Sequence, residues 1–168
     1  MAMRDKNKGF ALLIAVIFMS VMLSFGLALG SLGYKQQVLA SSSIRSQYAF
    51  YVADAALECA LRADQRENAF SYRAHSEENQ PNAISCGGAP ATRLSYFYAD
   101  RDRLVVVDRL SLDSGTRCAE VAIYKYANPQ PPSNVTSYIF AQGYDVSCAV
   151  VDDPGTARYV SRGVSAQY

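Results

Sequence analysis

Four cysteines carry the clearest chemistry in this sequence, because paired thiols can form disulfides. Cys59, Cys86, Cys118 and Cys148 all follow a long apolar stretch near the amino terminus. An even number of cysteines after a membrane-targeting segment predicts two disulfides, formed in an oxidising compartment. No Cys-x-x-Cys pair occurs, and structural zinc sites usually need such pairs, so we expect no metal.

Other residues that support catalysis are scarce. The single histidine, His75, lies in a polar stretch, and no Gly-rich phosphate loop, His-x-x-x-His pair or Gly-x-Ser-x-Gly motif occurs. Asp113 and Asp152-Asp153 do not match a calcium loop and are better explained as turn residues. Asn134-Val135-Thr136 matches a glycosylation sequon, a pattern that is usually accidental in bacterial chains. We therefore expect neither enzyme activity nor a cofactor.

The composition gives no signal for a nucleic-acid partner. The 168 residues include 16 Lys+Arg and 15 Asp+Glu, so the formal net charge is +1, and a nucleic-acid binder needs a basic surplus. The chain also has 12 Tyr and no Trp. These tyrosines could form an adhesive face, although aromatic residues are also ordinary in β-strands.

The long apolar stretch itself has no charged residue between Lys8 and Lys35. A membrane-spanning helix needs about 20 apolar residues, and residues 10–34 satisfy that length. The basic start of the chain would stay in the cytoplasm and the larger part would be exported. A cleaved signal peptide has a shorter apolar core of about 7–15 residues. Ala28-Leu29-Gly30 nevertheless offers a small-x-small cleavage pattern, which leaves ordinary signal cleavage open.

Two features go beyond a plain anchor. Gly9 stands between Lys8 and Phe10, where the charged leader meets the apolar run. The helical pattern then continues over residues 35–62, with neither proline nor glycine. An apolar stripe is predicted on this second half of the helix, and its members are Val38, Tyr48, Val52, Ala55, Ala56, Cys59 and Ala60. The charged residues are predicted mostly off that stripe: Lys35, Arg45, Asp54, Glu58 and Arg62.

On these residues the sequence resembles the type IV pilin family, which includes the pseudopilins of type II secretion. The matching elements are the short basic leader ending at Gly9, Phe10 as the first mature residue, and the unbroken apolar helix. The stretch AFYVADAALECAL, with its acidic Asp54, looks like the helix of minor, pilus-assembly-type pilins. The specific motifs cover residues 8–62.

The resemblance implies processing and partners. A prepilin peptidase would cut between Gly9 and Phe10 and methylate the new amino group of Phe10. The helix would hold the subunit in the inner membrane, beside an assembly platform, with its C-terminal domain outside. In a surface filament the same helix would pack against other pilin-like subunits, held together by the hydrophobic effect.

One residue departs from the family pattern. The family usually has a glutamate at the fifth mature position, and this chain has Ile14 there. A buried carboxylate that pairs with a neighbour's terminal amine fixes register, because a buried charge left unpaired costs several kcal/mol. Its loss looks like the tip-capping pseudopilin and certain minor pilins. We therefore favour a minor, initiating or tip subunit over a major pilin, although some families simply tolerate the loss.

Glycines at positions 26, 30 and 33 lie late in the apolar run. Gly26 and Gly30 form a small-xxx-small pattern that could let helices pack closely. Glycine is also common in membrane helices, and Gly26, Gly30 and Gly33 could instead let the helix melt locally. The sequence does not choose among the three.

The segment after the helix has the pattern of an antiparallel sheet. Residues 63–92 are polar and broken, which predicts a connecting loop, and residues 93–168 form the predicted β-domain. Strands are expected at 93–98, 104–112, 118–126, 137–144 and 157–166, with a hairpin turn at Asp113-Ser114-Gly115. One long helix packed on an antiparallel meander is an α+β fold.

Four cysteines allow three pairings. We favour Cys59–Cys86, which would tie the end of the helix to the loop, and Cys118–Cys148, which would staple the third strand to the C-terminal segment. In all, the sequence predicts a non-catalytic, pilin-like structural subunit. The alternatives are a major filament subunit and a membrane-anchored binding module that never polymerises; a secreted enzyme is a distant third.

Overall fold

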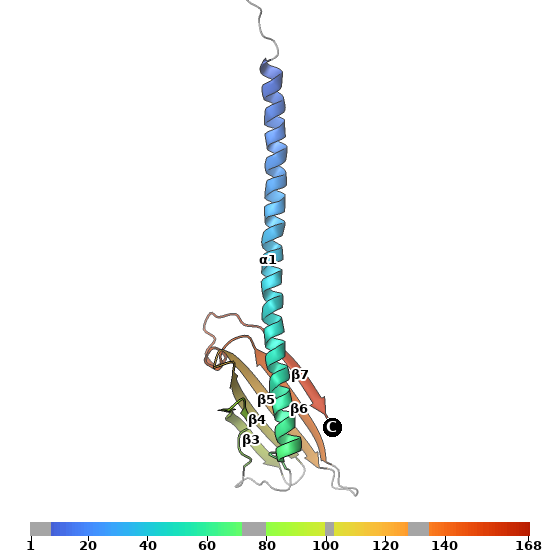
Figure 1. Cartoon of the computed structure of the whole chain (residues 1–168), viewed down its shortest axis with the longest axis vertical. Helices are drawn as coiled ribbons and strands as arrows, with labels where there is room; N and C mark the ends of the chain where they lie inside the picture. Colours follow the sequence, from blue (N-terminus) through green and yellow to red (C-terminus); the bar gives the residue numbers. More distant parts are fainter. Residues whose placement is uncertain (1–7, 72–79, 100–102, 128–134) are drawn as a thin grey trace, which may run out of the picture. The chain divides into compact units, whose positions relative to one another are not determined.

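The computed structural model describes residues 8–71, 80–99, 103–127 and 135–168. The chain divides into two compact units, Met1–Ser42 and Ser43–Tyr168. One helix, α1 (Lys8–Glu67), contributes to both units. In the second unit α1 packs on an antiparallel β-sheet, so the predicted α+β fold is confirmed (Figure 1).

In the first unit, α1 is apolar on every side. Residues 10–34 carry no charge, and an 18-residue window of the helix has a mean hydropathy of 2.6, long and apolar enough to cross a membrane. The serine hydroxyls in this part are satisfied within the helix: Ser20 donates to the Ile17 carbonyl and Ser24 to the Ser20 carbonyl. These serines therefore need no water, which suits a helix surrounded by apolar material.

The helix ends later than the sequence predicted, at Glu67 rather than near Arg62. Asn68 follows in the left-handed region with φ of 51°, where asparagine is better tolerated than most residues. The Ala69 amide then donates to the Ala63 carbonyl at 3.0 Å, which satisfies one of the orphan carbonyls of the last turn. The first residues of the predicted loop are thus the last turn of α1.

The sheet has five strands in the order β3-β4-β5-β6-β7, and every neighbouring pair is antiparallel. The strands are β3 (Thr92–Ala99), β4 (Arg103–Leu112), β5 (Arg117–Ala127), β6 (Val135–Tyr144) and β7 (Ser161–Gln167). This sequential order is the predicted meander. Asp113, Ser114 and Gly115 all have positive φ, which makes the tight β4–β5 turn at its expected place.

Three short elements were not predicted. Within the predicted loop, β1 (Ser85–Cys86) pairs with β2 (Ala89–Pro90) around Gly87 and Gly88, both at positive φ. Between β6 and β7 the chain forms a short helix, α2 (Cys148–Asp152). The expected last strand is also shorter than predicted: residues 157–160 are outside the ladder with β6, so β7 (Ser161–Gln167) begins at Ser161 rather than 157.

The face of α1 that packs on the sheet is an alanine stripe. Its buried members are Ala49, Ala53, Ala56, Leu57, Ala60 and Ala63. The predicted stripe was therefore partly wrong: Ala56 and Ala60 are buried, but Tyr48 and Ala55 are exposed. Small side chains let the helix backbone approach the strands closely.

The closest approach is at Gly143 of β6. A Cβ atom at Gly143 would lie 2.3 Å from the Ala49 carbonyl oxygen and 2.4 Å from the Ala53 amide nitrogen. No side chain other than hydrogen fits between strand and helix at this point. The remaining core is formed by alternate, inward-facing strand residues such as Leu104, Ile123 and Ile139.

Candidate functional site

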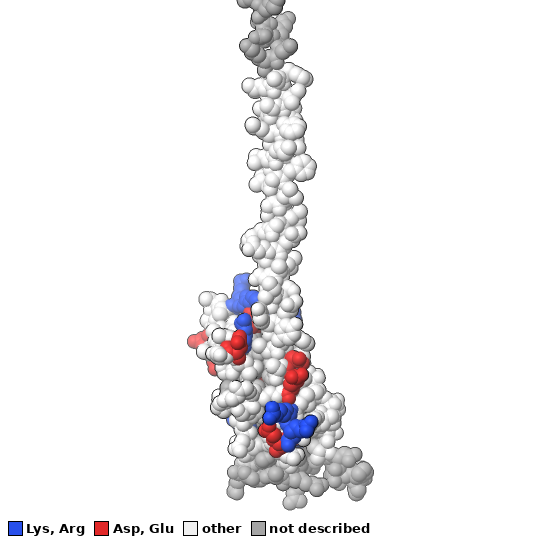
Figure 2. All heavy atoms as spheres, viewed as in Figure 1, with Lys and Arg blue, Asp and Glu red and all other residues white. Residues whose placement is uncertain are grey.

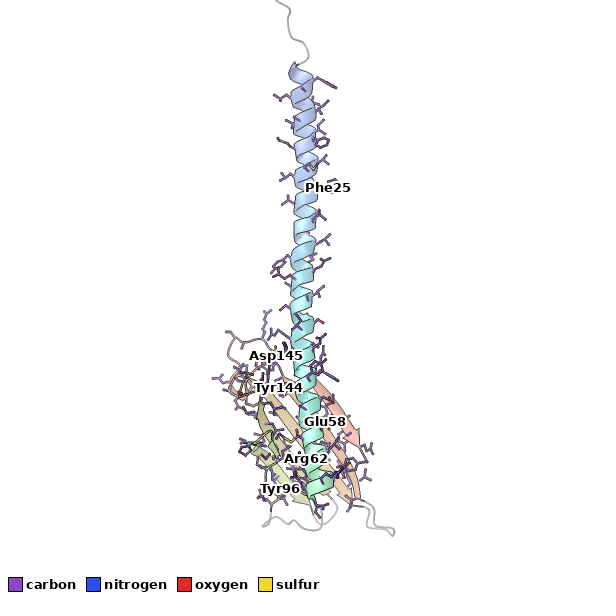
Figure 3. All side chains as sticks on the ribbon, viewed as in Figure 1. Phe25, Glu58, Arg62, Tyr96, Tyr144 and Asp145 are labelled. Atoms are coloured by element: carbon purple, nitrogen blue, oxygen red, sulfur yellow. A yellow bond between two sulfur atoms is a disulfide. The ribbon has the colours of Figure 1, made fainter. Side chains whose placement is uncertain are left out.

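In the described part of the chain, the first part of α1 exposes a long apolar surface. We call residues 10–34 the stem. The large apolar side chains of the stem are exposed along its whole length; Phe10 is 69% exposed, Ile14 46% and Phe25 63% (Figure 3). A soluble monomer rarely exposes a continuous apolar surface of this extent. The stem therefore needs a lipid environment or other apolar surfaces around it.

The predicted processing site lies in the first turns of α1. Lys8 and Gly9 are helical, with side-chain environments outside the described residues, and Phe10 is exposed. Ile14 lies one turn after Phe10 and contributes one more apolar side chain to the stem.

The stem glycines present bare backbone. A Cβ atom built on Gly26, Gly30 or Gly33 would meet nothing within 4 Å. None of the three glycines is therefore explained by packing inside the chain. They remain available for a close approach of another helix.

Two disulfides join the cysteines, Cys59–Cys86 and Cys118–Cys148, which is the pairing that the sequence analysis favoured. Cys59–Cys86 ties α1 to β1, and Cys118–Cys148 ties β5 to α2. Each closes a loop of roughly 30 residues, for which the chain-entropy model gives about 3–4 kcal/mol. No described cysteine is free.

Two ion pairs with buried carboxylates join α1 to the rest of the second unit. Asp64, on the buried face of α1, accepts from Lys125 Nζ at 2.6 Å and from the Tyr168 hydroxyl. Burial, together with the hydrogen bond to Asp64, raises the pKa of Tyr168. Near the other end of the packed segment, Arg45 donates to the buried carboxylate of Asp145. Such pairs fix geometry, since removing one partner would strand a buried charge.

A second polar cluster lies where α2 covers the sheet. Arg109 donates to Glu120 and to Asp152, and the Tyr144 hydroxyl donates to Glu120 at 3.2 Å. Burial, reinforced by the charge of Glu120, raises the pKa of Tyr144 to about 12. Asp152 is thus engaged by an arginine, which argues against the calcium role considered for it.

The outward side of α1 borders a groove of about 810 Å³. Charged side chains of α1 line one wall: Glu58, Arg62 and Glu67. Figure 3 labels Glu58 and Arg62 on this helix. The opposite wall contains the Cys59–Cys86 disulfide and the β1–β2 turn. The sequence analysis placed Glu58 and Arg62 off the apolar stripe but did not predict the groove that they line.

Among the described residues, no group of three or more His, Cys, Asp or Glu side chains could hold a metal ion. Asp113 accepts from the Thr116 hydroxyl within the β4–β5 turn, as expected of a turn residue. His75 and Asn134 lie outside the described residues.

Comparison with known proteins adds no relative: no family model, curated protein or solved structure matches this chain. The function is therefore inferred from the stem, the packed half of α1 and the groove.

Proposed function

We propose that this chain is a non-catalytic, pilin-like structural subunit of a type IV pilus or a related pseudopilus. The observation that carries the proposal is the division of α1. Its first part is apolar on every side and has no partner among the described residues of its own unit. Its second part is the spine of an α+β domain with two disulfides. One helix thereby supplies both an insertion segment and a scaffold.

The stem has two environments in this proposal. In the inner membrane it holds the subunit in lipid before assembly. In a filament, the stems of neighbouring subunits replace the lipid, so the hydrophobic effect favours a bundle of stems over stems in water. The exposed backbone at Gly26, Gly30 and Gly33 supports close packing in such a bundle.

Processing and partners follow from the same proposal. A prepilin peptidase removes residues 1–9 and methylates Phe10, and an inner-membrane platform assembles the subunit with other pilin-like chains. The absence of a glutamate at Ile14 supports a minor, initiating or tip position. At that position no neighbour's terminal amine needs a carboxylate from this chain.

Intact mass and amino-terminal sequencing of the membrane-extracted, unreduced chain test the proposal. We expect a methylated Phe10 terminus and a mass four hydrogens below that of the reduced chain, as two disulfides require. Gly9→Val should block cleavage, because the family's peptidase is expected to need glycine before the cut. Gly33→Val is the matched control and should leave cleavage intact.

The other outcomes identify the alternatives. A terminus at Met1 in cells that process their own pilins would leave a membrane-anchored binding module and would end the pilin proposal. A terminus at Ser31 would mean ordinary secretion with the stem discarded. Recovery of the processed chain from sheared surface filaments, by immunoblotting, would separate a filament subunit from a processed chain that stays in the membrane.

A further inference from the structure

The face of the sheet that points away from α1 is apolar and aromatic. In β4 and β5 the residues that face α1, such as Leu104 and Ile123, are fully buried, and those that alternate with them, such as Val105 and Tyr124, are partly exposed. An antiparallel sheet with one solvated face usually carries polar side chains on that face. On this outer face we call one set of residues the aromatic band: Phe97, Val105, Val107, Tyr124, Tyr138 and Phe140. A surface of this composition is typical of a binding site.

The strand register brings the band together. Val105 of β4 lies opposite both Phe97 of β3 and Tyr124 of β5. Tyr138 of β6 lies opposite Tyr124, and the centroids of the two tyrosine rings are 6.0 Å apart. Because neighbouring strands are about 4.8 Å apart, this row of four residues crosses about 14 Å of the sheet. The band is therefore elongated and runs across the strands.

The ring of Phe140 lies along the sheet rather than upright on it. A Cβ atom at Gly163 of β7 would come within 2.8 Å of two atoms of this ring. The ring therefore occupies the place above Gly163 that a larger residue would fill. Glycine at this position lets the band present an aromatic ring over the neighbouring strand.

The charges beside the band are already engaged. The Arg103 guanidinium lies 5.3 Å from the centroid of the Phe97 ring. Arg109, on the same face of the sheet, is paired with Glu120 and Asp152. By contrast, the side of the second unit that carries α1 bears both acidic and basic side chains (Figure 2). A nucleic acid or another anionic polymer needs several available cations, so the band suits a neutral ligand.

Polar groups accompany the aromatic rings. In the part of the chain that the structure describes, the hydroxyls of Tyr124 and Tyr138 make no hydrogen bond to the protein. Gln167 lies opposite Tyr138, Ser165 lies opposite Phe140, and both polar side chains are exposed. The band thus offers ring faces for stacking, with hydrogen-bonding groups beside them.

The open part of this face is small. α2 covers the adjoining part, because Cys148 and Asp152 of α2 bind Cys118 and Arg109. The five strands, with about three rows of outward residues, leave an area of roughly 19 Å by 13 Å, or about 260 Å². A standard protein interface buries about 800 Å² on each partner. A single extended polymer chain therefore matches the band better than a folded protein does.

We propose that the aromatic band binds a neutral β-linked glucan, the chemical class of cellulose, by stacking sugar rings on its aromatic side chains. A sugar ring whose hydroxyls are all equatorial has two apolar faces of C–H groups and a polar edge. The faces stack on aromatic rings, and the edge forms hydrogen bonds. Sheet faces bind oligosaccharides in other folds, such as the OB-fold. This inference goes beyond the proposed function and holds whether or not the chain polymerises.

Titration calorimetry with cellohexaose tests the inference. The full chain is kept in micelles of a detergent that has no sugar headgroup, so that the detergent does not compete for the band. We expect saturable binding with the same affinity at low and high salt, because a neutral ligand is not screened. Mannohexaose has the same linkage but one axial hydroxyl on each ring. It should bind more weakly, because that hydroxyl interrupts an apolar face.

Variants of the aromatic rings identify the surface. Tyr124→Ala/Tyr138→Ala should weaken the binding of cellohexaose by about fivefold to a hundredfold, the range expected for two aromatic contacts. Phe50→Ala/Tyr51→Ala is the matched control, since it removes another pair of neighbouring, exposed rings, on α1. The control should leave the affinity unchanged.

Gly163→Ala tests the band without removing a ring. The new Cβ displaces the Phe140 ring from the sheet, which should weaken binding by about twofold to tenfold. This variant keeps the inference testable if Tyr124→Ala/Tyr138→Ala does not fold, and thermal unfolding of each variant shows whether it has folded.

Four results would overturn the inference: no binding of cellohexaose by the folded wild type, equal binding of mannohexaose, equal losses for the two aromatic pairs, or an unchanged affinity in Gly163→Ala. Self-association of the wild type that Tyr124→Ala/Tyr138→Ala abolishes, without binding of cellohexaose, would assign the band to a second copy instead. None of these results bears on cleavage between Gly9 and Phe10, so failure of this inference and failure of the proposed function are distinguishable.

Discussion

Replacing Gly143 with alanine tests how closely α1 packs on the sheet. The new Cβ would lie 2.3 Å from the Ala49 carbonyl oxygen and 2.4 Å from the Ala53 amide nitrogen. Both contacts are with backbone atoms, so no rotation of a side chain can relieve them. Either β6 or α1 must move, and α1 is held on both sides of this point by Arg45–Asp145 and Asp64–Lys125.

The expected cost follows from two opposing effects. Without a clash, a Gly→Ala change stabilises a protein by about 0.4–1 kcal/mol, because it restricts the unfolded chain. Overpacking a rigid core costs about 1–3 kcal/mol, occasionally more, and a contact between backbones belongs at the upper end. We therefore expect Gly143→Ala to lower the free energy of unfolding by about 2–3 kcal/mol. For a unit of this size that corresponds to a fall in Tm of about 8–12 °C.

Thermal unfolding of the full chain in detergent micelles measures this change. The chain has 12 Tyr and no Trp, so tyrosine fluorescence reports on the β-domain. Gly163→Ala is the matched control: its Cβ would meet the Phe140 ring at 2.8 Å, and that ring can rotate away, so a loss of about 1 kcal/mol or less is expected. A Gly143 variant as stable as the wild type, or less affected than the Gly163 variant, would refute the close-packing argument.

Three further predictions concern the polar contacts and the disulfides. Lys125→Met should lower the free energy of unfolding, measured in urea, by about 3–5 kcal/mol, because Asp64 would be left as a buried charge without Lys125. Adding Asp64→Leu to this variant should recover much of the lost stability. The free energy of unfolding should fall between about pH 10 and pH 12, because the pKa of Tyr144 is raised from 10 to about 12 in the folded chain and the unfolded phenol loses its proton first. Tyr144→Phe should make this fall with pH less steep. An equally steep fall in the variant would contradict the role of this phenol. Replacing both Cys118 and Cys148 by serine should lower the free energy of unfolding by about 3–4 kcal/mol, and a loss below about 1 kcal/mol would contradict the loop-closure estimate.

The sheet could be predicted because apolar and polar side chains alternate along its strands. In β4 and β5 every second side chain is buried against α1, and that period of two is present in the sequence. The β4–β5 turn was equally visible, since Gly115 and its neighbours suit positive φ. The order of the strands followed from short connections, which favour neighbours in sequence as neighbours in the sheet.

Other features depended on contacts between distant residues. The end of α1 was missed because residues 63–67 are mostly polar, and the burial of Ala63 and Asp64 depends on the sheet. Tyr48 was predicted on the buried face of α1, but Ala49 is buried instead. The larger side chain of the tyrosine suggested a core residue, whereas the close packing of helix on sheet leaves room only for the alanine. The pairs of Asp64 with Lys125 and of Arg45 with Asp145 join residues far apart in sequence, and no local pattern indicates them.

The sequential order of the strands also bears on how the domain forms. Each strand of the meander pairs with the next one along the chain, and local pairings of this kind close quickly. Contacts between α1 and the sheet instead join the beginning of the domain to residues far along the chain, such as Ala49 to Gly143. We expect the hairpins to form before α1 docks on them. Mutations in the alanine stripe should therefore act mainly on the rate of unfolding, whereas mutations in the β4–β5 turn should slow folding itself.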